Sequence, residues 1–469
     1  MNFKRSLIAV LMSGIAGTCC AAGAKPAPPT YCVVDTGQVQ AFSDSGQLPR
    51  APRPGEPFFG QDACYQGPQP GYRDNGDGTI SDLNTGLTWV KARGEKVTWN
   101  DAVAGAARCR VGGCTDWRAP TIKELYSLIN FRGGCHPEGN SVPYLDTRYF
   151  EFKYGDTAAG ERVIDCQDWS ATTYVGTTMR GNLTAFGVNF ADGRIKGYPK
   201  AAPGPGGITE KKLYVRYVRG NPDYGKNDFH DNGDGTIADR ATGLMWAKAD
   251  SGKAMNWQEA LAWVQEKNKE NYLGHNDWRL PSAKELQSIV DYTRAPQAAD
   301  QSRRGPAIDP AFQVTKLPDG DYPFFWTGTT HLDGPLNMMG CAAVYVAFGR
   351  ATGWMQPRFG GGPPGMGGPG PGGPPGGGFG GPGPRGPGPG GPPGSGPQAS
   401  GSDNYQLLDV HGAGAQRSDP KKGDPATFPH GRGPQGDVVR IYNYVRAVRS
   451  IDPASVRLVL TDPAPRPAP

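Results

Sequence analysis

The stretch Asp74-Asn75-Gly76-Asp77-Gly78-Thr79-Ile80 returns without change as Asp231-Asn232-Gly233-Asp234-Gly235-Thr236-Ile237. Glycine, asparagine and aspartate tolerate the positive φ angles that a tight hairpin turn requires, and β-type residues follow both stretches. The pattern therefore predicts a strand, a turn and a second strand at each place. Because the whole stretch recurs, the chain is predicted to contain one structural unit twice.

Further landmarks follow both turns in the same order. Thr85-Gly86-Leu87-Thr88-Trp89 corresponds to Thr242-Gly243-Leu244-Met245-Trp246, and Asp116-Trp117-Arg118 corresponds to Asp277-Trp278-Arg279. Eight of the ten tryptophans of the chain fall into four matched pairs. Stacking on a sugar is one use of such side chains, but recurrence beside helix signals favours core packing. We expect a structural role for Trp89, Trp117, Trp169, Trp246, Trp278 and Trp326.

Each copy carries the signals of two helices between short strands. One helix is expected to begin at Trp99 or Trp257, ahead of an alanine-rich run. The other follows a capping box, Thr121 with Glu124 in the first copy and Ser282 with Glu285 in the second. A strand-like segment then closes each copy, at residues 213–219 and 442–449. The predicted fold class is α+β: two tandem copies of a compact domain with two helices and short antiparallel strands.

The N-terminus predicts export. Lys4 and Arg5 precede an apolar run from Leu7 to Ile15 that is too short to span a bilayer, which is typical of a signal peptide. We expect cleavage after Ala24 and a periplasmic, secreted or cell-surface protein with no transmembrane segment. A lipid anchor on one of the two cysteines at 19 and 20 is the alternative.

The expected organisation is a signal peptide at 1–24, a lead-in at 25–70, domain 1 at 71–221 and domain 2 at 227–450, followed by a disordered tail at 451–469. Residues 359–397 are almost all glycine and proline, a composition that cannot bury apolar surface and predicts disorder. Strand-like sequence on both sides makes this stretch a loop inserted within domain 2. Residues 203–207 are interpreted as a short analogue in domain 1.

The paired Asp-Asn-Gly-Asp-Gly-Thr, Thr-Gly-Leu-x-Trp, Asp-Trp-Arg-x-Pro and Tyr-Val-Arg motifs resemble those of the Lcl C-terminal domain family. The resemblance implies a compact fold similar to C-type-lectin-like and formylglycine-generating-enzyme-like domains. It also implies a ligand-binding or adhesive role at the cell surface. In the collagen-like adhesin that gives the family its name, the domain is associated with sulfated glycosaminoglycans, and that specificity is not carried over to residues of this chain.

Cysteine usage agrees with export. Cys109 and Cys114 flank a short loop, and the aligned stretch of the second copy lacks both, as a local disulfide predicts. Cys341 is left over, as a free thiol or as part of an intermolecular bridge. Three bridges of undetermined connectivity are expected among Cys32, Cys64, Cys109, Cys114, Cys135 and Cys166.

The sequence offers no motif for catalysis, a metal or a cofactor. The Asp-Asn-Gly-Asp-Gly stretches resemble calcium loops, but Asn84 and Ala241 stand where the bidentate glutamate belongs, so hairpin turns are favoured. The histidines lack zinc-binding spacing, and no catalytic triad or phosphate-loop signature is present. A net charge of +5 permits an acidic partner, while the lack of a concentrated basic stripe argues against nucleic acid.

One segment of copy two, residues 409–421, mixes several polar residue types and is predicted to form a loop, where binding residues tend to lie. The alternative is a self-contained, hydrogen-bonded loop. The predicted function is an exported, non-catalytic binding or adhesion protein for an anionic polysaccharide or a cell-surface protein. An enzyme or enzyme accessory on a formylglycine-generating-enzyme-like scaffold, and a purely structural envelope protein, are the alternatives. The candidate ligand-binding residues are His411, Gln416, Arg417, Asp419 and Lys421.

Overall fold

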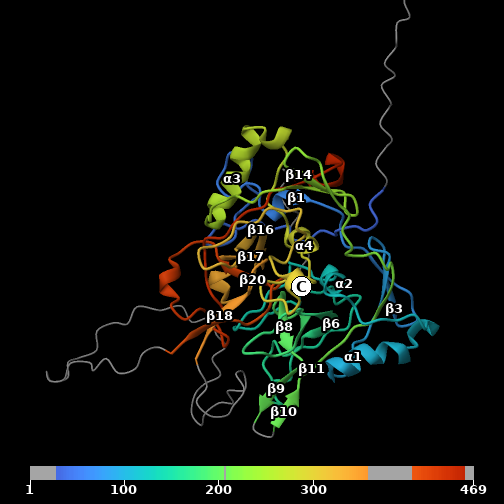
Figure 1. Ribbon diagram of the computed structural model, residues 1–469. Coiled ribbons are helices and arrows are strands. Elements are labelled where there is room, and N and C mark those ends of the chain that lie inside the picture. The colour runs from blue at the N-terminus through green and yellow to red at the C-terminus, as the bar shows by residue number, and fades with distance from the viewer. Residues whose placement is uncertain (1–27, 205–206, 357–403, 460–469) are drawn as a thin grey trace, which may run out of the picture.

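The computed structural model describes residues 28–204, 207–356 and 404–459 (Figure 1). The signal peptide predicted for 1–24 and the Gly/Pro-rich loop predicted for 359–397 lie outside these residues. Within the described ranges, no helix combines the length and apolar character needed to cross a membrane.

Each copy contains a four-stranded antiparallel sheet that starts with the predicted hairpin. The turn glycines Gly76 and Gly78 have φ angles of 78° and 85°. Asp77 Oδ1 accepts hydrogen bonds from the backbone N and the hydroxyl of Thr79, at 3.0 and 2.6 Å, and Asp234 does the same for Thr236. The carboxylates of Asp77 and Asp234 therefore stabilise the two turns. The sheets are, in spatial order, β12 (Val218–Gly220), β4 (Leu87–Val90), β3 (Thr79–Asp82) and β2 (Tyr72–Asp74), and β21 (Val448–Ser450), β15 (Leu244–Ala247), β14 (Thr236–Asp239) and β13 (Phe229–Asp231).

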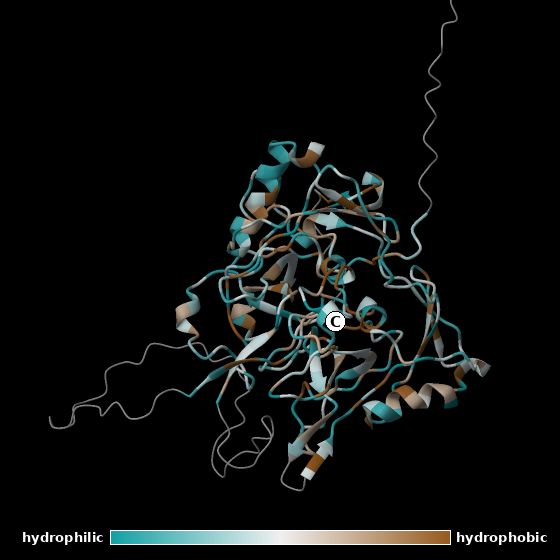
Figure 2. Ribbon diagram, viewed as in Figure 1, coloured by the Kyte–Doolittle hydropathy of each residue, from teal (hydrophilic) through white to brown (hydrophobic). Residues whose placement is uncertain are grey.

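Two α-helices follow in each copy, as predicted. They are α1 (Trp99–Gly105) and α2 (Ile122–Ser127) in the first copy, and α3 (Trp257–Lys269) and α4 (Ala283–Ser288) in the second. Both predicted capping boxes form. Figure 2 shows brown and teal residues mixed along α1 and α3, as expected for helices with one buried face. Short 3-10 helices are η1 (Asp62–Cys64), η2 (Ala106–Arg108), η3 (Val111–Gly113), η4 (Tyr272–Gly274), η5 (Gln301–Arg303), η6 (Leu336–Met338), η7 (Pro425–Thr427) and η8 (Pro453–Ser455).

A six-stranded antiparallel sheet runs through both copies. Copy one contributes β6 (Asp168–Thr173), β7 (Thr184–Asn189) and β8 (Arg194–Pro199), and copy two contributes β16 (Phe324–His331), β17 (Ala342–Ala347) and β20 (Gln416–Pro420). The spatial order is β16-β17-β20-β8-β7-β6, so the copies meet where β20 pairs with β8. Figure 1 shows α1 and α3 at opposite ends of the molecule with α2 and α4 between them, as an approximate twofold relation requires.

The helices α2 and α4 join the copies through two reciprocal hydrogen bonds. Lys123 Nζ in α2 donates to the carbonyl of Ser288 at the end of α4 (2.6 Å). Lys284 Nζ in α4 donates to the carbonyl of Ser127 at the end of α2 (2.9 Å). Burial lowers the pKa of both lysines to about 8. One hydrophobic core contains residues of both copies, so the two units form one body.

The closing segments of the two copies are not the continuous strands that alternation predicted. In copy one, β11 (Lys212–Leu213) pairs with β5 (Val97–Thr98), and the segment rejoins a sheet only at β12. Between them, the fully buried Arg216 donates to the carbonyls of Val90 (2.9 Å) and Glu151 (2.6 Å), and also to that of Lys91. Arg446 makes the matching bonds to the carbonyls of Ala247, Lys248 and Gln313 before β21. An inward guanidinium thus interrupts each predicted strand.

Three short antiparallel pairs complete the fold. The lead-in strand β1 (Tyr65–Gln66) pairs with β22 (Arg457–Leu458), so the prediction of disorder is wrong for residues 451–459, and the rest of the predicted tail lies outside the described residues. The stretch 357–403 lies between β18 (Thr352–Met355) and β19 (Gln406–Asp409), within copy two as predicted. The supposed analogue at 203–207 instead joins β9 (Ala201–Gly204) and β10 (Gly207–Glu210) after β8, so the two segments are not equivalent.

The six tryptophans expected to pack are all buried, with exposed fractions of 5% or less. Four of the six indole N–H groups donate inside the protein, whereas those of Trp89 and Trp246 are buried without a hydrogen-bond partner among the described residues. Trp169 Nε1 donates to the carbonyl of Val97 (3.1 Å) and Trp326 Nε1 to that of Met255 (2.9 Å). Trp117 and Trp278 make a second matched pair of such bonds. These contacts leave the rings within the cores, where no sugar can stack on them.

We expect the protein to unfold in one cooperative transition, because the central sheet and the shared core join the two copies. Differential scanning calorimetry should give a calorimetric enthalpy equal to the van't Hoff enthalpy. Two separate transitions would contradict the single body described above.

Arg216→Met should lower the free energy of unfolding by about 3 kcal/mol, because buried carbonyl groups lose their donor. Arg219→Met, in the same segment, is the matched control. Arg219 pairs with Asp116 at the surface, so its loss should change stability by less than about 1 kcal/mol. Urea denaturation of both variants tests this, and equal effects would argue against a special role for the buried guanidinium.

Candidate functional site

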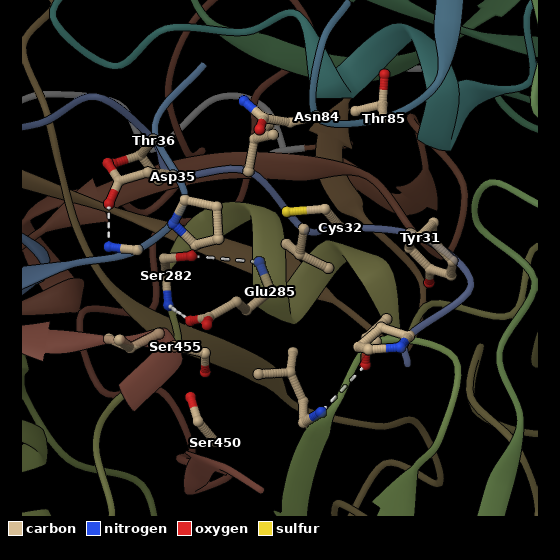
Figure 3. Close-up of a pocket in the computed structure, with 18 of the residues that line it drawn as sticks. Tyr31, Cys32, Asp35, Thr36, Asn84, Thr85, Ser282, Glu285, Ser450 and Ser455 are labelled. Atoms are coloured by element: carbon tan, nitrogen blue, oxygen red, sulfur yellow. Dashed lines mark hydrogen bonds between the residues drawn. The ribbon is translucent and has the colours of Figure 1, made fainter. Parts of the chain in front are cut away.

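A cavity of about 500 Å³ lies where the lead-in meets both copies (Figure 3). Residues 29–36 of the lead-in form one wall, and the turn between β3 and β4, with Asn84 and Thr85, forms another. Copy two supplies the N-terminal end of α4, while Ser450 and Ser455 come from the end of β21 and from η8. Figure 3 shows Asp35 and Thr36 on one side of this space, Tyr31 on another, and Ser450 and Ser455 opposite Asn84.

Two aspartates of the lead-in line the cavity. The oxygens of Asp35 accept hydrogen bonds from the backbone N of Gly37 (2.7 Å) and of Gly67 (2.8 Å), which fixes the loop. Asp62 Oδ2 accepts from the hydroxyls of Thr36 (2.7 Å) and Thr329 (2.6 Å). Burial, together with repulsion from Asp35, raises the pKa of Asp62 to about 7.

An ion pair of copy two forms the facing wall. Arg279 and Glu285 make two hydrogen bonds, with Nη2 to Oε1 at 2.6 Å. Glu285 Oε2 also accepts from the backbone N of Ser282 (2.9 Å) as part of the capping box of α4. Although burial acts to raise it, the pKa of Glu285 lies below its usual value because Arg279 stabilises the charged form. This pair is therefore a fixed part of the wall.

The rest of the lining combines apolar side chains with one thiol. Val34, Leu244 and Leu280 are buried and line the cavity. Burial raises the pKa of Cys32 to about 11, and Asp82 adds to the effect, so the thiol is protonated at neutral pH. Since the thiolate is the nucleophilic form, this cysteine is a poor nucleophile. A concave site with apolar walls and a few polar groups is typical of ligand binding.

The predicted binding residues do not lie on an exposed loop. Gln416, Arg417 and Asp419 are in strand β20 of the central sheet, and His411 and Lys421 flank it. The exposed fraction of His411, Gln416, Asp419 and Lys421 is 3% or less. The polar composition of the segment suggested a surface loop, but the sheet that joins the two copies buries it.

These residues form hydrogen bonds with neighbouring side chains and with the backbone. His411 Nε2 lies 2.7 Å from Asp437 Oδ1 and 2.9 Å from Arg417 Nη1, and burial lowers the pKa of His411 to about 4. Asp419 Oδ2 accepts from the backbone N of Arg440 and of Ile441, at 3.0 and 3.1 Å. Lys421 Nζ donates to Thr330 Oγ1 (2.8 Å) and lies over the ring of Trp257. The segment is thus closer to the self-contained alternative than to a binding surface.

The three predicted disulfides are absent from the structure. Cys64 is buried in η1, and Cys166 Sγ lies 3.7 Å from the carbonyl of Val163. Joint absence from copy two marked cysteines as candidates, but a disulfide also needs the two side chains to be adjacent, which sequence does not specify. Free thiols are found at Cys32, Cys64, Cys109, Cys114, Cys135, Cys166 and Cys341.

Comparison with known families agrees with the duplicated architecture. The model of the Lcl C-terminal domain matches residues 78–219 and 235–358, which together are more than half of the chain. The chain belongs to the Lcl C-terminal domain family. The first match ends within β12, whereas the second ends before β19, β20 and β21, which pair with β18, β17 and β15 of the matched region. No curated protein and no solved structure gives a significant match.

Sequence reasoning identified Glu285 and Arg279 only as members of repeated motifs, and it missed Asp35 and Asp62. The two aspartates occur in the lead-in, which is present once and has no counterpart for comparison. No spacing pattern links them to Arg279, more than 200 residues away in the sequence. Only folding brings these groups to the same cavity.

The raised pKa of Asp62 predicts a pH-dependent stability. Its value of about 7 lies above the ordinary 3.8, so the folded state retains a proton that the unfolded state loses. This contribution is present in full below about pH 4 and is lost as the pH rises through about 7. The Tm of the ligand-free protein at pH 5 minus that at pH 8 contains this contribution of Asp62 and an opposite one from the buried His411, whose pKa is about 4. Asp62→Asn should reduce that difference by several degrees, and an unchanged difference would contradict the assignment.

Proposed function

We propose that this protein is an exported, non-catalytic binding protein whose ligand occupies the cavity between the lead-in and the two Lcl C-terminal domains. The observation that carries this proposal is the cavity of about 500 Å³ to which all three segments contribute. Small-molecule sites fall in this range of volumes and occur preferentially where domains meet. Export rests on the N-terminal sequence described above.

The state of the polar groups favours binding over catalysis. Arg279 and Glu285 neutralise each other, Asp35 is held by two backbone N–H groups, and Cys32 is protonated. Asp62 favours the second candidate, an enzyme, because an acid with a pKa near 7 can transfer protons at neutral pH. Its Oδ2 is engaged by two threonine hydroxyls, so proton transfer would fall to Oδ1. Turnover of a bound ligand would distinguish the enzyme from the binding protein.

Two finer predictions belong with this proposal. The antiparallel strands and two α-helices of each copy support a C-type-lectin-like fold, which the family resemblance implies. An anionic polysaccharide or a cell-surface protein stays the predicted macromolecular partner, in agreement with the net charge of +5. Such a partner needs a surface other than the buried residues of β20 and its flanks.

The proposal is tested by a thermal-shift screen of the mature chain against small metabolites and short glycans. A ligand present at about one hundred times its Kd should stabilise the fold by about 2.7 kcal/mol. Ser455→Trp places a large side chain on an exposed lining residue and should abolish the shift. Val103→Trp, on the exposed face of α1 away from the cavity, is the matched control and should keep it. Ligand shifts that Ser455→Trp leaves unchanged would place the binding site elsewhere.

A further inference from the structure

The cavity carries an excess of acidic groups. Asp35, Asp62 and Glu285 line it, whereas Arg279 is the guanidinium among the lining residues. Since Arg279 is already paired with Glu285, the two lead-in aspartates are left without a cationic partner in the lining. The buried Asp82 and Lys284, which interact electrostatically, add one group of each sign and leave the acidic excess unchanged.

Lys284 does not neutralise these acids by direct contact. Its Nζ donates to two backbone carbonyls, those of Asp35 (3.0 Å) and Ser127 (2.9 Å). It is therefore used in the joint between the copies, although its charge acts electrostatically on Asp35, Asp62 and Asp82. A second positive charge near the aspartates would be stabilised by groups that are already in place.

Asp62 has one oxygen available for such a charge. Both threonine hydroxyls donate to Oδ2, and no other group in the described part of the chain donates a hydrogen bond to Oδ1. The residue is only 8% exposed, and it lines the cavity. A buried carboxylate gains most from a donor that carries charge, because charge-assisted hydrogen bonds are the stronger ones.

The remaining walls suit an aliphatic body. Val34, Leu244 and Leu280 bring buried apolar side chains to the cavity, and Tyr31 brings an aromatic one. A ligand with a charged end and a hydrocarbon chain would therefore match both kinds of wall.

We infer that the cavity selects a small aliphatic amine, with its ammonium group hydrogen-bonded to Asp62 and attracted by Asp35. This inference rests on the proposed function, since it takes the cavity as the ligand site. It adds the charge and the chemical class of the ligand, which the net positive charge of the whole chain would not suggest.

Binding of an ammonium group should release a proton. At neutral pH part of the Asp62 population is protonated, and a cation beside the carboxyl favours the charged form. Amine affinity should therefore rise as the pH increases from about 6 to about 8. The titratable and charged groups that act on Asp62 come from the lead-in, η1, α2, α4 and the segment before α4: Asp35, Cys64, Tyr126, Lys284, Glu285 and Arg279.

Three probes of equal chain length separate charge from shape: pentane-1,5-diamine, pentane-1,5-diol and glutarate. Isothermal titration calorimetry of the mature chain should show the diamine binding at least about tenfold more tightly than the diol, and glutarate more weakly still. The enthalpy of diamine binding should differ between two buffers of different ionisation enthalpy, because binding releases protons to the buffer. Asp62→Asn keeps an acceptor for the threonine hydroxyls, and it should weaken diamine binding about tenfold and remove the pH dependence.

Glu266→Gln, on the exposed surface of α3, changes the net charge by the same amount and is the control. It should leave diamine affinity unchanged. Equal binding of diamine and diol, both blocked by Ser455→Trp, would overturn the amine selectivity and leave the cavity as the ligand site. Binding of none of the three probes would also overturn the inference, while the metabolite screen would still decide the proposed function. Diamine binding that Asp62→Asn does not weaken would place the amine elsewhere.

Discussion

The fold depends on the contact between α2 and α4, where each helix accepts a lysine of the other at its C-terminal end. Free carbonyls at a helix C-terminus carry partial negative charge and need donors when they are buried. Lys123 and Lys284 supply those donors across the junction, so neither helix end is satisfied within its own copy. The pairing of β8 with β20 extends the same junction into the central sheet. Separating the copies would leave buried polar groups without partners on both sides.

The lead-in breaks the equivalence that the duplication creates. The two copies share matched ion pairs, Arg118 with Glu124 and Arg279 with Glu285. The side chain of Arg118 is 34% exposed, whereas that of Arg279 is 6% exposed and lies near the ring of Tyr65. Thr329 and the corresponding Thr172 of copy one accept from the first backbone N of α4 and α2, and Thr329 also donates to Asp62 of the lead-in. The cavity therefore exists on the side of copy two that the lead-in covers.

Buried charge is distributed differently around His411, which the sequence indicated as a site, and in the cavity, which the structure revealed. Around His411, a guanidinium and a carboxylate neutralise each other in direct contact, although His411 Nδ1 is buried with no hydrogen-bond partner among the described residues. In the cavity, two lead-in aspartates share their surroundings with a cation that is already paired. Composition alone pointed to the first place because several polar residue types lie close together in the sequence, at 409–421. The unbalanced place is assembled from segments distant in the sequence.

Local chemistry determined the turns, the capping boxes and the repeat, because each depends on residues within a few positions of one another. The Asp-Asn-Gly-Asp-Gly turns, the helices after Thr121 and Ser282 and the duplicated order all follow from the sequence. The sequence did not determine the inward turn of Arg216 and Arg446, the burial of β20 or the shared sheet. These features depend on which distant backbone groups lack partners. The cavity could not be predicted from the sequence for the same reason. Asp35 and Asp62 acquire a common environment with Arg279 only when the lead-in packs between the two copies.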